Sequence, residues 1–278
     1  MGTLSLGYSP CPNDTFIFYA LVHGKIPTDD LRFMEILEDV ETLNQMARSA
    51  ELDITKVSFH AYGHLREHYC LLRSGGALGK GCGPLLVAKE DFEIKDPRNR
   101  TIAIPGRLTT AYLLLQIFGI RAEDKIKVMP FHRIIDAVKS GEVDSGLIIH
   151  ESRFTYQRSG LMKVMDLGER WEQETGLPLP LGGIIAKRRL GKTVVSRAER
   201  LIRDSVEYAF SKRDEPLAYI KEHSQEMEDA VIEKHINLYV NQYSLDLGED
   251  GTRAVEELIR MSEEKGIIEK SAKPLFSV

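Results

Sequence analysis

Short apolar runs of strand type alternate with segments of helical periodicity through the first two thirds of this sequence. The strand-type runs span 3–8, 31–37, 52–58, 83–90, 101–106, 125–130, 145–151, 160–168 and 179–189. Segments of helical type lie at 14–24, 39–51, 59–67, 109–119 and 131–144, and the pattern from 193 onward is helical. A strand–helix–strand order of this kind predicts an α/β fold with a mostly parallel sheet and helices on its faces.

A polar segment at 91–100, which contains Pro97, interrupts this alternation. The alternation of strands and helices resumes after this segment. The strand at 179–189 is expected to return to the unit formed by the residues before that segment. We therefore expect a larger domain formed by 1–90 plus 185–278 and a smaller inserted domain formed by 91–184. Two α/β units connected in this way leave a cleft between them, which is where small ligands usually bind.

Composition argues against several kinds of partner. The chain has 278 residues, 28% of them charged, and its formal charge of −5 gives no basis for binding nucleic acid or an anionic membrane. No apolar run approaches the ~18 residues needed to span a bilayer, and the N-terminus has no signal-peptide pattern. The three cysteines are widely spaced, so we expect a reduced, cytoplasmic protein. The sequence does not decide its oligomeric state.

Polar side chains follow the first and third predicted strands. The joint SPCPND carries Ser9, Asn13 and Asp14 between two apolar segments, and the third strand ends in Lys56 and Ser58. The joint could be a structural turn, with its prolines only stiffening the chain. It could equally form the wall of a pocket that offers polar groups to a ligand.

The run PGRLTTA at 105–111 follows a strand and begins a helix. Gly106 permits a tight turn, and either Thr109 or Thr110 can cap the helix. The first N–H groups of a helix have no intrahelical partner, so this start suits a carboxylate or a hydroxyl-rich ligand. Simple helix capping is the competing interpretation. The glycine-rich run at 73–83 fits neither nucleotide-binding pattern and is read as a hinge or a close backbone approach.

His150 is the titratable residue of greatest interest because it ends an apolar strand, in the run IIHES. An imidazole with an ordinary pKa of ~6.5 is a usable general base near neutral pH. A structural role for the ring is the alternative. Cys11 precedes a helix and could be a nucleophile or a packed thiol. His64 and His68 have helical spacing without a third ligand, so no metal site is predicted, and His235 is read as a packing or surface residue.

Seven runs of the sequence together resemble the 1,4-dihydroxy-6-naphthoate synthase family of the futalosine route to menaquinone. They are SPCPNDTFIFYALVHG, EDVETLN, SGGALG, PGRLTTAY, GLIIHESRFTY, TGLPLPLGG and YVNQYSLDLGE, and they extend over nearly the whole chain in the family's order. The resemblance implies a two-domain fold of the periplasmic-binding-protein type (type II), used by a cytoplasmic enzyme with a ligand cleft between its domains.

The resemblance also implies a reaction and a set of site residues. Cyclic dehypoxanthinylfutalosine would be converted to 1,4-dihydroxy-6-naphthoate and dihydroxyacetone, with no metal or organic cofactor. His150 would be the proton acceptor, and the substrate contacts of the family fall on Lys56, Val57, Ser58, Thr110 and Ala111. Two other functions share the fold: a solute-binding protein without catalytic activity, and chorismate dehydratase, which performs a different elimination.

Overall fold

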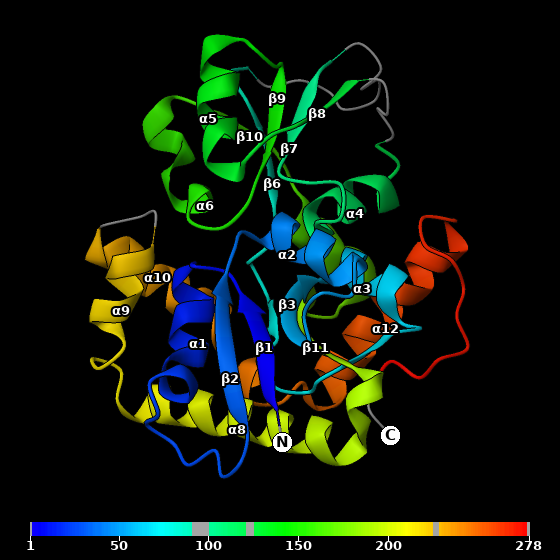
Figure 1. Cartoon of the computed structure of the whole chain (residues 1–278). Helices are drawn as coiled ribbons and strands as arrows, with labels where there is room; N and C mark the ends of the chain where they lie inside the picture. The colour runs from blue at the N-terminus through cyan, green and yellow to red at the C-terminus, as the bar shows by residue number, and fades with distance from the viewer. Residues whose placement is uncertain (1, 91–99, 121–124, 225–227, 277–278) are drawn as a thin grey trace.

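The computed structural model describes residues 2–90, 100–120, 125–224 and 228–276. Over these ranges the chain forms two lobes, each built around a mixed β-sheet (Figure 1). The expected crossing at 91–100 falls almost entirely on 91–99, outside the described residues. Within the described ranges, no helix has the length and apolar character needed to cross a bilayer.

The sheet of the larger lobe has the strand order β2-β1-β3-β11-β4, and β5 also pairs with β11. Parallel pairing joins β1 to β2 and to β3, whereas β11 runs antiparallel to β3, β4 and β5. Because β1 and β3 are parallel neighbours, the residues that follow them lie at the same edge of the sheet. The six strands are β1 (Thr3–Tyr8), β2 (Arg32–Leu37), β3 (Ile54–Ser58), β4 (Tyr69–Leu71), β5 (Ala77–Gly79) and β11 (Leu179–Lys187).

The sheet of the smaller lobe has the order β10-β6-β9-β7-β8. Here β7 runs parallel to β8 and β9, and β6 runs antiparallel to β9 and β10. The residues that follow β7 and β9 therefore also share one edge. The five strands are β6 (Leu85–Ala88), β7 (Ile102–Ile104), β8 (Ile126–Val128), β9 (Ser145–Ile148) and β10 (Met162–Asp166).

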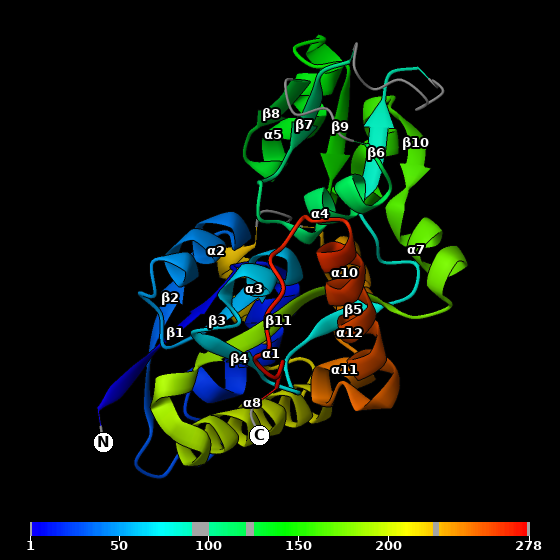
Figure 2. The same cartoon turned by 90° about the vertical axis from the view of Figure 1, so that its right-hand side faces the viewer.

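The helices cover both faces of the larger sheet and join the two lobes. One apolar cluster packs α1, α8 and α10 against one face of the larger sheet, while α3 and α12 pack on the other, as the two views show (Figures 1 and 2). In the smaller lobe, α5 packs against β7 and β9. The longer helices are α1 (Pro12–Val22), α2 (Val40–Arg48), α3 (Phe59–Leu65), α4 (Thr110–Ile117), α5 (Phe131–Ser140), α7 (Leu167–Thr175), α8 (Gly191–Ser211), α9 (Leu217–His223), α10 (Asp229–Tyr239) and α12 (Gly248–Glu264). Short turns of helix lie at α6 (Ser152–Thr155), α11 (Gln242–Leu245), Tyr156–Ser159 and Arg188–Leu190.

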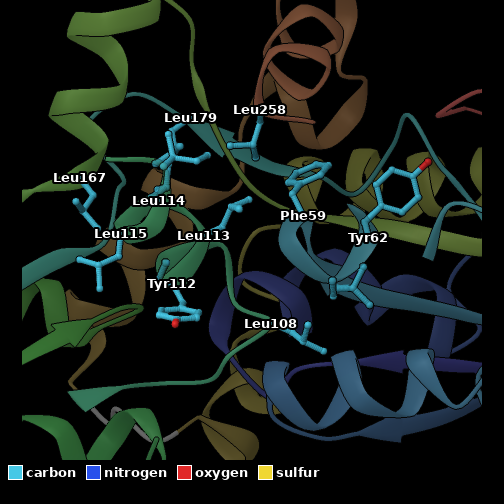
Figure 3. Close-up of a cluster of buried hydrophobic side chains, with 14 of the residues drawn as sticks. Phe59, Tyr62, Leu108, Tyr112, Leu113, Leu114, Leu115, Leu167, Leu179 and Leu258 are labelled. Carbon is cyan, nitrogen blue, oxygen red and sulfur yellow. The ribbon is translucent and has the colours of Figure 1, made fainter. Parts of the chain in front are cut away.

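A single hydrophobic cluster extends from one lobe into the other (Figure 3). Helix α4 lies within it and contributes Leu113, Leu114 and Leu115, all fully buried. Phe59 reaches this cluster from the larger lobe, and Leu147 reaches it from the smaller sheet. Burial of apolar area on both sides of α4 stabilises the junction of the lobes. The start of α4 is thereby held where the two sheets approach each other.

The prediction of a mostly parallel sheet was correct only in part, because one strand in each sheet, β11 or β6, runs opposite to the others. The reversed strands are β6, by which the chain enters the smaller sheet, and β11, by which it returns to the larger one, and the direction of such a strand depends on where the chain enters the sheet. β4, β5 and α7 were missed. The two strands have three residues each, too few to show a periodicity, and β5 lies in the glycine-rich run read as a loop.

Sheet membership differs from the expected domain boundaries at 90 and 184. β6, expected in the larger domain, pairs with β9 and β10 of the smaller sheet. Residues 179–184 of β11, expected in the smaller domain, pair with strands of the larger sheet. The chain thus changes sheets a few residues earlier than expected at both ends of the insertion. The polar break around Pro97, which suggested the boundary, lies beyond the first strand of the smaller sheet.

Candidate active site

One cavity is lined by residues of both lobes, at the edges where the parallel strands end. The end of β3, the loops after β1 and β9 and the starts of α1 and α4 form most of its wall. The remaining wall is largely apolar and includes Val40, Pro84 and Leu181. The structure brings together around this cavity all ten residues singled out in the sequence, which are Ser9, Asn13, Asp14, Lys56, Val57, Ser58, Thr109, Thr110, Ala111 and His150.

The SPCPND joint is a pocket wall whose polar groups are also tied to one another. α1 begins at Pro12, in the first helical turn, where a missing N–H costs nothing. The buried Asp14 carboxylate accepts hydrogen bonds from the Ser9 hydroxyl (2.7 Å), the Ser9 N–H (3.2 Å) and the Asn13 side-chain amide (2.8 Å). Asp14 therefore organises the loop, and the carboxylate is not simply free for a ligand.

Lys56 completes this network from β3. Its Nζ lies 2.7 Å from Asp14 Oδ1, in an ion pair whose side chains are only 5% and 3% exposed, and 3.1 Å from the carbonyl oxygen of Gly75. An ammonium group has three N–H donors. Among the described residues, two of them have partners, which leaves one donor for a ligand in the cavity.

Ser58 is held by Asn44, a residue that the sequence reasoning did not select. The Ser58 N–H donates to Asn44 Oδ1 (2.9 Å), and Asn44 Nδ2 donates to the Ser58 hydroxyl (3.2 Å). Asn44 is fully buried in α2. An asparagine on the apolar face of an amphipathic helix was the available signal, since a buried amide needs hydrogen-bond partners.

Thr109, rather than Thr110, caps α4. The Thr109 hydroxyl accepts a hydrogen bond from the Tyr112 N–H (3.3 Å). The Thr110 hydroxyl instead joins the lobes, because it accepts from the Phe59 N–H (2.9 Å) and donates to the Leu181 carbonyl (2.6 Å). What α4 can offer to a ligand is therefore its first-turn backbone, namely the N–H groups of Thr110 and Ala111.

His150 lies just beyond β9, which ends at Ile148 rather than at 151 as expected. Its backbone has a φ of +54°, in the left-handed region that terminates the strand and turns the ring to the cavity wall. The ring is half-buried and lies edge-on to Phe131, with centroids 5.1 Å apart. Burial lowers the pKa of the His150 imidazole below its ordinary value, and the nearby Glu151 carboxylate acts in the opposite direction.

A second histidine stands behind His150. The His235 ring, from α10, is fully buried and nearly parallel to the His150 ring, with centroids 6.1 Å apart. Its Nε2 lies 2.9 Å from Asn13 Oδ1, and its Nδ1 lies 3.7 Å from a carboxylate oxygen of Glu151. From the sequence, His235 was only a histidine within a helix. Its contacts with Asn13 and Glu151 could not be predicted, because these residues are far from it along the chain.

The side chains of Cys11, His150 and Glu151 also meet beside the cavity. One ligand atom from each lies within 4.8 Å of the other two. Within the described ranges this is the one group of histidine, cysteine and acidic side chains close enough together to hold a metal ion. The sequence predicted no such group, and its metal candidates His64 and His68 do not belong to it.

Fold and cavity together define a class: a two-lobed α/β protein of the periplasmic-binding-protein type, with a small-molecule cavity between its lobes. A Candida albicans protein described as having the generic periplasmic binding protein fold superposes with a TM-score of 0.67, at 14% identity, over 98% of this chain and 92% of that one. The alkanesulfonate-binding protein SsuA of Xanthomonas axonopodis gives a TM-score of 0.71 at 13% identity, over 97% and 95%. At these identities the likeness concerns the fold alone.

Sequence comparison identifies the family. The family model described as "Menaquinone biosynthesis" matches residues 4–264. The 1,4-dihydroxy-6-naphthoate synthase of Thermus thermophilus is 49% identical over 99% of this chain and 100% of its own, and that of Streptomyces coelicolor is 45% identical over 96% and 95%. A crystal structure of an Archaeoglobus fulgidus protein, 38% identical, gives a TM-score of 0.88 over 96% and 98%. The chain belongs to the 1,4-dihydroxy-6-naphthoate synthase family of menaquinone biosynthesis, and it is an enzyme.

Proposed function

We propose that this enzyme converts cyclic dehypoxanthinylfutalosine to 1,4-dihydroxy-6-naphthoate, with release of dihydroxyacetone, in the cavity between its lobes. The observation that carries the proposal is the position of His150 on the wall of the same cavity as the Lys56 ammonium and the start of α4. The near full-length similarity to the two synthases supports the choice of substrate. We also propose that the enzyme acts in the cytoplasm.

His150 is the proposed general base. Because burial lowers the pKa of its imidazole, the ring is neutral near pH 7 and can accept a proton from the sugar-derived part of the substrate. Elimination and carbon–carbon cleavage follow, which makes the enzyme a lyase, and formation of the aromatic product favours the overall reaction. The Glu151 carboxylate is close enough to stabilise the imidazolium that His150 becomes.

Three groups are proposed to hold the substrate. The backbone N–H groups of Thr110 and Ala111 at the start of α4 suit a carboxylate, because two N–H donors and the positive end of the helix dipole converge there. The remaining Lys56 N–H donor would bind a hydroxyl or carbonyl oxygen. The apolar wall around Val57 and Leu181 suits the bicyclic part of the substrate.

The decisive experiment compares substrates. Purified protein is incubated separately with cyclic dehypoxanthinylfutalosine and with chorismate, and the products are followed by liquid chromatography and mass spectrometry. We expect turnover of the first compound alone. Turnover of chorismate would instead identify a chorismate dehydratase, and tight binding of either compound without turnover would identify a solute-binding protein.

The role of His150 is tested by His150→Ala. We expect kcat to fall by about 10² to 10⁴, with little change in ligand affinity, because positioned proton transfer contributes a factor of that size. His68→Ala is the matched control, since this histidine is exposed and does not line the cavity. A His150→Ala enzyme with the turnover of the unmodified protein would refute the assignment of the base.

A further inference from the structure

Both oxygens of the Glu151 carboxylate are buried, and neither has a hydrogen-bond partner among the described residues. Only 7% of the residue and 10% of its side chain are exposed. A carboxylate removed from water without partners is strongly disfavoured, so buried acidic groups are paired, protonated or bound to metal. Something that donates to these oxygens, or neutralises them, is needed at this position.

His235 has a ring nitrogen without a hydrogen-bond partner that faces Glu151. The Asn13 amide is oriented by its Nδ2, which donates to Asp14 (2.8 Å), so that Asn13 Oδ1 faces His235 and accepts from its Nε2–H (2.9 Å). The neutral ring then carries its lone pair on Nδ1, which is buried and has no hydrogen-bond partner in the described part of the chain. This atom lies 3.7 Å from Glu151, so two acceptors face each other.

Cys11 and His150 stand beside these acceptors. The Cys11 sulfur, a ring nitrogen of His150 and a Glu151 oxygen all lie within 4.8 Å of one another. Burial and the negative charge of Glu151 raise the pKa of the Cys11 thiol, so without a cation the sulfur keeps its proton. A divalent cation would displace that proton to solvent, and the thiolate and the carboxylate would then neutralise its two positive charges.

We propose that Cys11, His150 and Glu151 form a binding site for a thiophilic divalent cation such as Zn²⁺. Sulfur, imidazole nitrogen and carboxylate oxygen are all zinc ligands, with bonds of about 2.0–2.3 Å that separate tetrahedral ligands by roughly 3.3–3.6 Å. The ligand atoms lie within 4.8 Å of one another, so each pair needs to approach by about 1.5 Å at most. His235 is the nearest further donor, and its Nε2–H bond to Asn13 is the outer contact that zinc-binding histidines commonly make.

Occupation of this site has a consequence for activity that rests on the proposed function. A cation bound to the His150 nitrogen occupies the lone pair that would accept the substrate proton. Cation binding and proton abstraction then exclude each other, and Zn²⁺ inhibits the enzyme reversibly, with activity restored by a chelator.

The test is a titration of metal-free protein with Co²⁺, followed through the near-ultraviolet thiolate-to-cobalt charge-transfer band, and with Zn²⁺ by calorimetry. We expect one equivalent to bind, and we expect Cys11→Ser to abolish the band while Cys70→Ser, at a buried cysteine outside the group, retains it. Glu151→Gln is expected to weaken Zn²⁺ binding on the order of tenfold or more. Circular dichroism melting curves show whether each variant is folded. If Cys11→Ser is not folded, Cys11→Ala replaces it in the titration.

Absence of stoichiometric binding, or an unchanged band in the folded Cys11 variant, would overturn the proposal and indicate that Glu151 and His235 instead share a proton. Unchanged Zn²⁺ affinity in His150→Ala would remove His150 from the ligand set and would overturn the site as proposed, whereas stoichiometric binding without inhibition, with affinity lost in His150→Ala, would contradict His150 as the base and leave the site standing. Lack of turnover by the metal-free protein would contradict the proposed function alone, because the titration does not depend on activity.

Discussion

At the scale of single residues, the cavity depends on a buried polar chain that runs from Lys56 through Asp14 and Asn13 to His235. Each hydrogen bond of this polar chain orients the next group. Because the polar groups of the SPCPND loop have partners, the loop can be buried between apolar segments. Removing one partner from such a chain leaves the others unsatisfied in a medium of low dielectric constant.

The ion pair between Asp14 and Lys56 is expected to respond unequally to its two truncations. Asp14→Ala leaves the Lys56 ammonium with only the Gly75 carbonyl, so we expect a loss of about 3–5 kcal/mol in the free energy of unfolding. Lys56→Met should cost less, because Asp14 keeps three hydrogen bonds from Ser9 and Asn13. Urea denaturation measures both changes.

The matched control for this pair is Glu207→Ala, which breaks an exposed i,i+4 ion pair with Arg203. We expect it to change the free energy of unfolding by about 0.5 kcal/mol or less. Equal losses for Asp14→Ala and Glu207→Ala would show that burial of the cavity ion pair has no energetic weight.

The pH dependence of activity follows from His150 as the proposed base. Its pKa is lowered by burial, so the neutral form that accepts a proton persists as the pH falls through the ordinary value of ~6.5. We therefore expect the acid limb of the kcat/KM profile to have its midpoint below that value. The profile is measured in metal-free buffer, and a midpoint above ~6.5 would contradict the direction of the shift.

At the scale of elements, the start of α4 is where a capping residue and a binding site coincide. Thr109 holds the first turn through Tyr112, and the Glu41 carboxylate, from α2, accepts a hydrogen bond from the Leu108 N–H (3.2 Å) just before it. A Cβ at Gly106 would lie 2.4 Å from the Glu41 carboxylate. A side chain at this glycine would displace the Glu41 carboxylate from its hydrogen bond to Leu108.

Thr109→Ala removes the cap of α4. We expect a loss of about 1 kcal/mol in the free energy of unfolding, together with a higher KM, because the first-turn N–H groups of Thr110 and Ala111 lose their fixed orientation. Thr109→Ser keeps the hydroxyl and is expected to restore both quantities. If KM rises equally in the serine variant, the hydroxyl cap is not what positions the site.

At the scale of the whole molecule, the two crossings between lobes pass each other at Gly83 and Gly168. A Cβ built on Gly83 would lie 2.3 Å from the backbone of Gly168, and one on Gly168 would lie 2.6 Å from the backbone of Gly83. Two backbone segments can approach so closely only where neither residue has a side chain. The relative position of the lobes, and with it the cavity, depends on this contact.

Gly83→Ala is therefore expected to push the two crossings apart. Overpacking of this kind costs about 1–3 kcal/mol, and kcat/KM should fall as well because Gly83 also lines the cavity. Thermal unfolding and steady-state kinetics measure the two effects. Gly2→Ala is the control, since its Cβ would contact nothing within 4 Å, and a Gly83→Ala protein indistinguishable from it would show that the crossings tolerate separation.

Local patterns in the sequence were sufficient for the longer strands and most helices, but not for β4, β5 and α7. Strand ends place the next residues at an open edge, which is why His150 could be named before any fold was known, whereas the substrate contacts at Lys56 and Thr110 were implied by the resemblance to the family. The periodicity of β1, α2 and α5 is visible within a few neighbouring residues, so it needs no distant contact to be recognised.

The tertiary structure alone decided what those side chains meet. Strand direction in the mixed sheets, the sheet to which β6 belongs, and the approach of His235 to Glu151 all depend on pairings between residues far apart in the chain. Such contacts leave no periodic pattern in the sequence. The apolar pattern of each segment shows that the segment is buried, but not which distant segment it packs against. The sequence therefore determined which groups reach the cavity, whereas packing of the lobes determined their partners, their protonation and their freedom to bind.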